Sequence, residues 1–127
     1  GMTGQVMEDY LSRMRELGVQ IKEGTIEFQP SLLNPDEFLQ QESVFRYFNP
    51  RGEQQQILLE PGQLGFTFCQ VPIVYRISPG DNISLIYADG TQTFMDGHTL
   101  DPDISSGIFQ RSGELIQINV SFRHSDN

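Results

Sequence analysis

The stretch QLGFTFCQVPIVYRI, from Gln63 to Ile77, decides the fold class of this chain. Apolar residues alternate with small or polar ones in its first half, and a β-branched and aromatic run follows. A period of two indicates a β-strand, and a strand this apolar indicates burial on both faces of a sheet. We therefore expect it at the centre of the fold. Because proline cannot donate to a strand ladder, Pro72 predicts a bulge, an edge stretch or a break into two strands that serve different sheets.

Shorter strands surround this stretch. Asp89-Gly90 is a two-residue hairpin signal, and 96–106 reads as a polar loop. Strands are predicted at 43–48, 54–59, 83–87, 91–95, 107–110 and 115–123. Short strands joined by tight turns are typical of antiparallel sandwiches and jelly rolls. We predict a mainly β chain with an antiparallel β-sandwich or jelly-roll-like domain.

In the N-terminal part the apolar residues recur at a different spacing. Apolar residues at helical spacing predict one amphipathic helix over 5–17, ended by Gly18, and alternation then predicts a short hairpin over 19–29. Asn34-Pro35-Asp36-Glu37 predicts a helical turn with Asn34 as its N-cap. We therefore predict a single domain over 1–127, with the helix at 5–17, the hairpin at 19–29 and the β-sandwich at 43–123.

Composition narrows the possible partners. The chain has 127 residues, with 17 acidic against 8 Lys and Arg residues, for a formal charge of −9. This balance argues against nucleic acid and anionic membrane as partners. No stretch approaches the roughly 20 apolar residues of a membrane helix, and no charged-then-apolar pattern is seen before the predicted helix, so we expect neither export nor membrane insertion. The single Cys69, predicted as a small buried thiol in the apolar strand, fits a cytoplasmic location.

One loop gathers groups that could bind a metal. Between Asp96 and Asp103 it combines an imidazole with carboxylates, and the candidate ligands are His98, Asp96 and Asp101. The spacing matches no established metal motif and favours a turn-rich solvated loop. No catalytic residue and no cofactor is predicted, because nucleophile and phosphate-loop motifs are not found. For the aromatic strand 43–48, core burial is favoured over a binding platform.

The first third also carries a resemblance to a known family. Gly18, Gly24, Ile26, Phe28 and Pro30 follow the predicted helix in a pattern that resembles the junction before the C-terminal β-sandwich of cellobiose-phosphorylase-like bacterial glycoside phosphorylases and hydrolases. The resemblance covers mainly residues 5–33. It implies a carbohydrate-related, non-catalytic module, because the family's catalytic acids lie in a barrel that this chain lacks.

Three functional hypotheses follow from the sequence. The first is a non-catalytic β-sandwich accessory domain, partnered by the catalytic domain of a carbohydrate-active enzyme. The second is a stand-alone cupin-like or jelly-roll protein that binds a small ligand or a metal. The third is an interaction module that assembles with further copies of itself.

Overall fold

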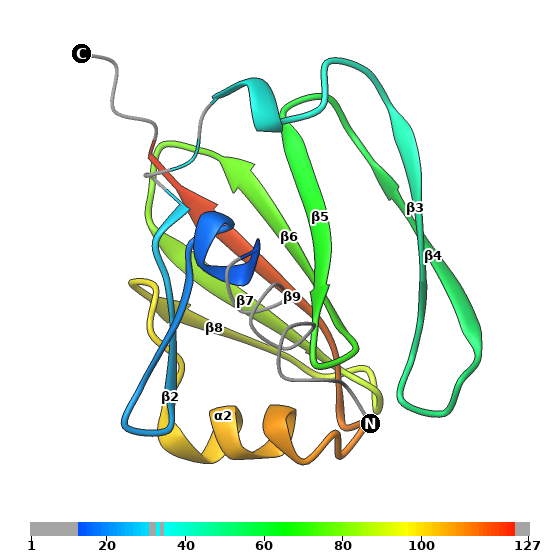
Figure 1. Ribbon diagram of the computed structural model, residues 1–127, viewed down its shortest axis with the longest axis vertical. Coiled ribbons are helices and arrows are strands. Elements are labelled where there is room, and N and C mark those ends of the chain that lie inside the picture. The colour runs from blue at the N-terminus through cyan, green and yellow to red at the C-terminus, as the bar shows by residue number, and fades with distance from the viewer. Residues whose placement is uncertain (1–12, 31–32, 34, 124–127) are drawn as a thin grey trace.

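The computed structural model describes residues 13–30, 33 and 35–123 (Figure 1). The elements follow in the order β1 (Val19–Lys22), β2 (Thr25–Phe28), η2 (Pro35–Glu37), β3 (Ser43–Phe48), β4 (Gln54–Leu59), β5 (Gln63–Phe68), β6 (Val71–Ile77), β7 (Asn82–Tyr87), β8 (Gln92–Asp96), α2 (Pro102–Phe109) and β9 (Leu115–Phe122). The predicted helix over 5–17 falls largely outside the described residues. Within them, 13–16 are helical and the chain turns at Leu17 and Gly18.

The described strands form one five-stranded sheet and two hairpins. The sheet has the order β5-β6-β9-β7-β8, and the hairpins are β1-β2 and β3-β4. The mainly β class is confirmed. Antiparallel pairing is found for the other described strand pairs, but β6 and β9 run parallel at the centre of a mixed sheet. The sandwich or jelly-roll arrangement is not confirmed by this pairing.

The stretch 63–77 forms two strands. Cys69 and Gln70 have φ angles of 51° and 65° and make the tight turn between β5 and β6, and such turns match the right-handed twist of hairpin strands. The predicted division into two strands is confirmed, but the break lies at Cys69 and Gln70 instead of at Pro72, and both strands belong to one sheet. Pro72 is accommodated because β9 pairs with β6 only from Ile73 onward. Burial of both faces is confirmed for β6, where all residues from Val71 to Tyr75 are buried.

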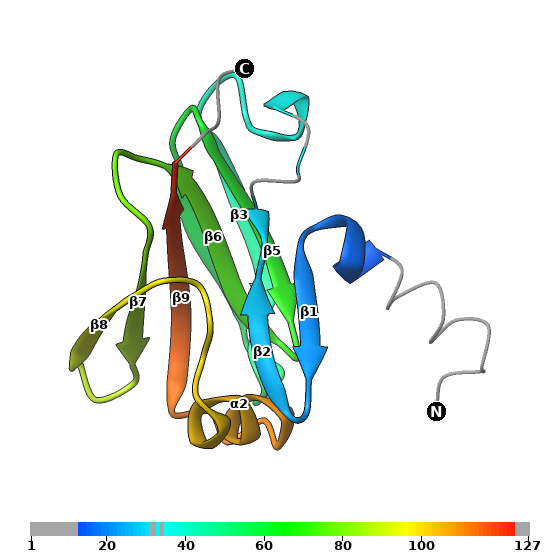
Figure 2. The ribbon, with the colours of Figure 1, turned by 90° about the vertical axis from the view of Figure 1, so that its left-hand side faces the viewer.

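Tyr75 is the centre of the core on one face of the sheet. Its ring meets those of Phe66, Phe28 and Phe122, with centroids 5.0, 6.2 and 6.1 Å away. Its hydroxyl donates to the Leu17 carbonyl at 2.8 Å, and burial raises the pKa of the phenol. The β1-β2 hairpin lies over this face of the sheet (Figure 2). The alternate strand residues that face this side of the sheet therefore share one hydrophobic core with the β1-β2 hairpin.

Helix α2 crosses one end of the sheet, in a region predicted from the sequence as a polar loop over 96–106 and a strand over 107–110 (Figures 1 and 2). The strand prediction is wrong, and the loop prediction holds only for 97–101, because α2 begins at Pro102. Asp101 is the N-cap, and its carboxylate accepts a hydrogen bond from the Ile104 nitrogen at 2.8 Å. Pro102 occupies the first turn, so the start signal is the same Asx-Pro pair that was recognised at 34–35.

The β3-β4 hairpin packs on the opposite face of the sheet, beside edge strand β5 (Figure 1). Gly65 makes this approach possible, because a Cβ there would lie 2.9 Å from Leu59 Cδ1 and 3.4 Å from the Phe45 ring. Phe45 and Tyr47 stack at 5.6 Å and are half-buried. Core burial of the whole strand is wrong, since Phe48 is 60% exposed. The hairpin is thus an arm seated on the sheet through a few side chains.

Candidate functional site

The sheet face under the β3-β4 arm is polar, in contrast to the core face. Strand pairing aligns two rows of side chains across all five strands. One row is Gln63, Arg76, Ser121, Asn82 and Asp96, and the next is Gly65, Val74, Asn119, Ser84 and Phe94. Since alternate residues of a strand share a face, the polar positions that alternate with the core residues of β9 gather here. The sheet therefore presents a broad array of hydrogen-bonding groups outside the core.

A groove of about 330 Å³ runs between this face and strand β4. We call it the sheet groove. Its volume lies at the lower end of the range of small-molecule sites. The apolar lining comes from Val74, Phe94 and the β4 residues Ile57, Leu58 and Leu59. The polar lining consists of five amides, two hydroxyls and one guanidinium, contributed by Gln63, Asn82, Gln92, Gln117, Asn119, Ser84, Ser121 and Arg76.

Hydrogen bonds within the groove orient its amides. Gln92 Nε2 donates to Ser84 Oγ at 2.8 Å, and Gln117 Nε2 donates to Asn119 Oδ1 at 2.7 Å. An amide carries two N–H donors and one carbonyl acceptor, so each group keeps further capacity for a ligand. Both donors and acceptors are thus held in defined positions along β9, β7 and β8.

Phe94 lies on edge strand β8 at the rim of the groove and is 70% exposed. A large exposed aromatic ring beside polar groups is a typical element of ligand recognition, because its face can pack against an apolar patch of the ligand. The groove therefore combines hydrogen-bonding groups with one aromatic surface.

A second cavity of about 250 Å³ lies where the tip of the arm meets the end of the sheet. Tyr47, Pro72, Leu115 and Ile116 contribute apolar surface, and Arg51 and Glu53 line it from the turn of the arm. Burial raises the pKa of the Tyr47 phenol, because desolvation favours its neutral hydroxyl. The lining of this cavity thus combines apolar side chains with one cationic and one carboxylate side chain.

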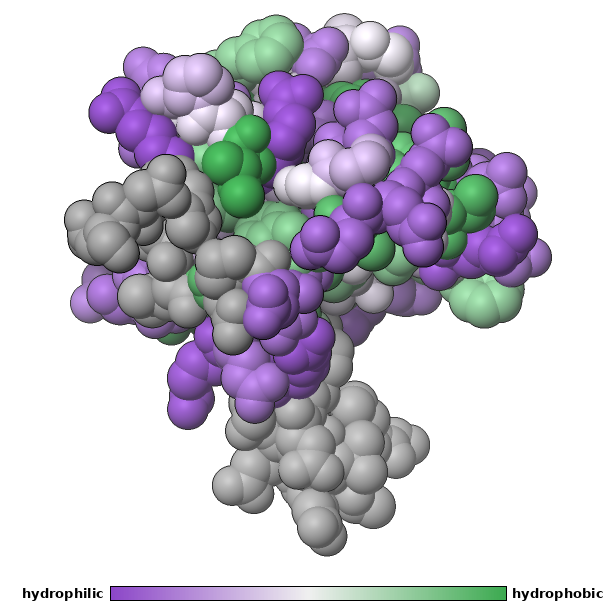
Figure 3. Space-filling view, turned by 90° about the horizontal axis from the view of Figure 1, so that it is seen from above, coloured by the Kyte–Doolittle hydropathy of each residue, from purple (hydrophilic) through white to green (hydrophobic). Residues whose placement is uncertain are grey.

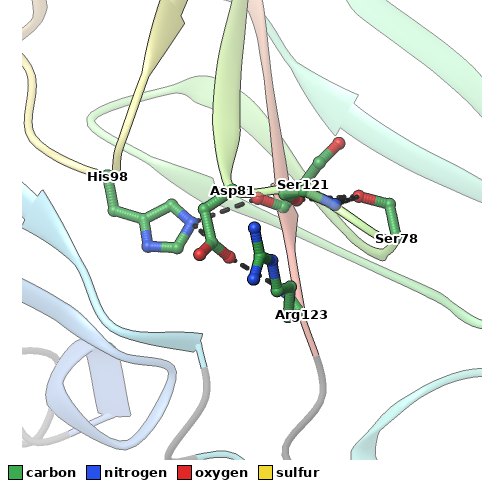
Figure 4. Close-up of polar contacts among 6 residues, drawn as sticks. Ser78, Asp81, His98, Ser121 and Arg123 are labelled. Carbon is green, nitrogen blue, oxygen red and sulfur yellow. Dashed lines mark hydrogen bonds and ion pairs between the residues drawn. The ribbon is translucent and has the colours of Figure 1, made fainter.

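His98 lies where the segment after β8 meets the ends of the sheet strands (Figure 4). Its Nε2 is 3.1 Å from the Ser121 carbonyl oxygen and 3.8 Å from Asp81 Oδ1. The same carboxylate oxygen accepts a hydrogen bond from the Arg123 nitrogen at 2.9 Å. These contacts tie the segment after β8 to the beginning of β7 and the end of β9. Asp81 was not recognised in the sequence, because it lies in a different turn and only the β7-β8 hairpin brings it to His98.

The three candidate metal ligands lie in different surroundings. Asp96 is the last residue of β8 opposite Asn82, His98 faces Asp81, and Asp101 caps α2. Across the residues that the structure describes, no group of three or more His, Cys, Asp and Glu side chains is arranged to hold a metal ion. A metal site at His98 stays a prediction from the sequence.

Comparisons with known proteins give no family for this chain. No protein-family model matches it, and no curated protein matches it either. The resemblance to cellobiose-phosphorylase-like proteins therefore stays a prediction. Within the described residues, none of the helices has the length and apolar character needed to cross a membrane.

Proposed function

We propose that this chain is a non-catalytic accessory domain that binds a hydroxyl-rich ligand, of the carbohydrate class, in the sheet groove. The single observation that carries the proposal is the lining of the groove, with oriented amides and hydroxyls on the sheet and the exposed ring of Phe94 at the rim. The sandwich arrangement and a cytoplasmic location stay predictions from the sequence.

The lining matches the chemistry of a sugar. Each sugar hydroxyl is both a donor and an acceptor, and an amide offers both partners from one side chain. The C–H face of a sugar ring is apolar and can lie against an aromatic ring. Gln92 and Phe94 are neighbours on one face of β8, so both kinds of contact are available to the same ligand.

In this proposal the chain binds the ligand, and a partner domain carries out the reaction. Glycoside hydrolysis ordinarily uses a pair of carboxyl groups flanking the bond that is cut, whereas the groove offers amides, hydroxyls and one guanidinium. The resemblance at residues 18–30 supports a partner domain that acts on carbohydrate. This arrangement would let the module hold a substrate beside the partner's active site.

Screening the chain against a glycan array, followed by calorimetric titration of the best glycans, tests the proposal. Gln92→Ala removes one groove amide and should weaken binding by about tenfold, the equivalent of one hydrogen bond. Gln56→Ala is the matched control, because Gln56 is exposed on β4 opposite Arg46. No binding to any glycan, or equal losses in the two variants, would refute the proposal.

Exposed apolar side chains of the arm favour a second candidate, an interaction module. Val44 and Leu58 are direct neighbours across β3 and β4, and Leu58 and Phe48 are 58% and 60% exposed. Seen from above, hydrophobic residues form separate patches among hydrophilic ones on the described surface (Figure 3). Light scattering after size exclusion tests self-assembly. A concentration-dependent dimer that Leu58→Asp dissociates would support this candidate, and a strict monomer at high concentration would refute it.

A further inference from the structure

We propose that the ligand of the sheet groove is an acidic oligosaccharide and that Arg76 binds its carboxylate. This inference rests on the proposed function and adds the substrate class, a sugar chain that contains uronic acid. Three observations support it: the charge of the groove, the free donor groups beside Arg76 and the spacing of the groove side chains.

The charge of the groove is opposite to that of the chain. Acidic residues outnumber Lys and Arg by 17 to 8 in the sequence, yet among the described residues that line the groove the only charged side chain is Arg76. A surface this acidic repels anions in general. A local cation among neutral amides therefore marks the one part of the sheet face where a carboxylate is favoured.

Arg76 is available to a ligand. It is exposed, and none of the ion pairs found in the described part of the chain includes it. Its neighbours in the strand row are the neutral Gln63 and Ser121. The acid of that row, Asp96, is three strands away, which corresponds to about 14 Å at the usual strand spacing.

Gln63 supplies a second donor beside the guanidinium. Its Oε1 accepts a hydrogen bond from the Glu60 nitrogen at 2.8 Å, so its Nε2 is left to donate. Gln63 and Arg76 are directly opposite on β5 and β6. The planar fork of a guanidinium fits both oxygens of a carboxylate, and an adjacent amide N–H can complete the set.

The spacing of the groove indicates a ligand longer than one sugar. Phe94 on β8 and Arg76 on β6 are separated by β9 and β7, again about 14 Å at the usual spacing between strands. One ring cannot reach both residues. A chain of a few sugar units could place one ring against Phe94 and the carboxylate of another at Arg76.

Calorimetric titration with matched pairs of trisaccharides tests the inference. Trimers of galacturonic and glucuronic acid are compared with the corresponding neutral trimers of galactose and glucose, in which a hydroxymethyl group replaces each carboxylate. We expect at least one acidic trimer to bind tenfold or more tightly than its neutral counterpart. Arg76→Gln should abolish that preference, so that it binds acidic and neutral trimers equally, and Arg76→Lys should restore the preference in part.

Arg46→Gln is the control, because Arg46 is exposed on β3 opposite Gln56 and outside the groove. It removes the same charge and should leave the preference unchanged. Equal binding of acidic and neutral trimers, or a preference that survives Arg76→Gln, overturns the carboxylate inference while the proposed function stands. Absence of binding to every trimer and every array glycan overturns both.

Discussion

Ser105 Oγ in helix α2 accepts a hydrogen bond from the backbone nitrogen of Ile26 in β2 at 3.0 Å, across 79 positions of sequence. Both residues are completely buried. The Ile26 carbonyl in turn accepts from the Leu100 nitrogen at 2.9 Å. Because a buried backbone N–H without a partner is costly, this one hydroxyl joins the helix to the first hairpin.

We expect Ser105→Ala to lower the free energy of unfolding by about 1–3 kcal/mol, since the Ile26 N–H would lose its acceptor in a site closed to water. Ser106→Ala is the matched control in the same helix. Ser106 is exposed, so its removal should change stability by less than about 0.5 kcal/mol. Urea unfolding followed by circular dichroism measures both, and equal effects would contradict the assigned role of Ser105.

Substitution of Gly65 should displace the arm. A Cβ in Gly65→Ala would lie 2.9 Å from Leu59 Cδ1, so we expect a loss of about 1–3 kcal/mol and weaker ligand binding in the groove. Gly107→Ala is the opposite case, because Gly107 lies inside α2 and its Cβ would make only an ordinary contact, 3.6 Å from Ser112 Oγ. Alanine should stabilise that helix by about 0.5–1 kcal/mol. Thermal and urea unfolding would measure both, and a neutral Gly65→Ala would show that the arm is not seated on this glycine.

Asp101 should act as a helix cap. Asp101→Ala is expected to cost about 1 kcal/mol, and Asp101→Asn to cost little, because asparagine retains the acceptor for the Ile104 nitrogen. Unfolding with and without a chelator separates this role from metal binding. The cost of Asp101→Ala should be the same in both conditions, and a cost that disappears with chelator would instead support the metal prediction.

Asp89 provides a pH-dependent prediction. Hydrogen bonds from the Thr91 hydroxyl at 2.6 Å and the Thr91 nitrogen at 2.9 Å lower the pKa of the Asp89 carboxyl. A pKa below that of the unfolded chain means that the carboxylate stabilises the β7-β8 turn at higher pH. This contribution is lost as the pH falls below about 4, through the folded-state pKa.

NMR titration measures that pKa directly. Thr91→Val should raise the pKa of Asp89 toward its ordinary value, because the hydroxyl donor is removed. Thr93→Val, at an exposed position of β8, should leave it unchanged. A pKa of Asp89 that is the same in all three proteins would show that the turn hydrogen bond does not form in solution.

Local signals in the sequence were sufficient for most of the strands. Turn signals between them predicted β3 and β4 as separate strands with their observed bounds, and Asp89-Gly90 predicted the β7-β8 hairpin. Such signals depend on neighbouring residues, so they can be read without the fold. The miss at α2 has a local cause as well, because Asp101-Pro102 is a helix start that was interpreted as turn chemistry.

The sequence by itself determined where the chain is extended, where it turns and which residues of each strand share a face. Only the tertiary structure decided that β6 and β9 pair in parallel, that the arm packs beside β5 next to the polar face and that Arg76 lies in a row with Gln63 and Ser121. The physical reason is that pairing between distant strands depends on burial summed over the whole sheet. The entropic cost of closing the intervening loop grows only slowly with loop length, so loop length hardly discriminates between possible partner strands. No local sequence pattern therefore specifies the partner strand.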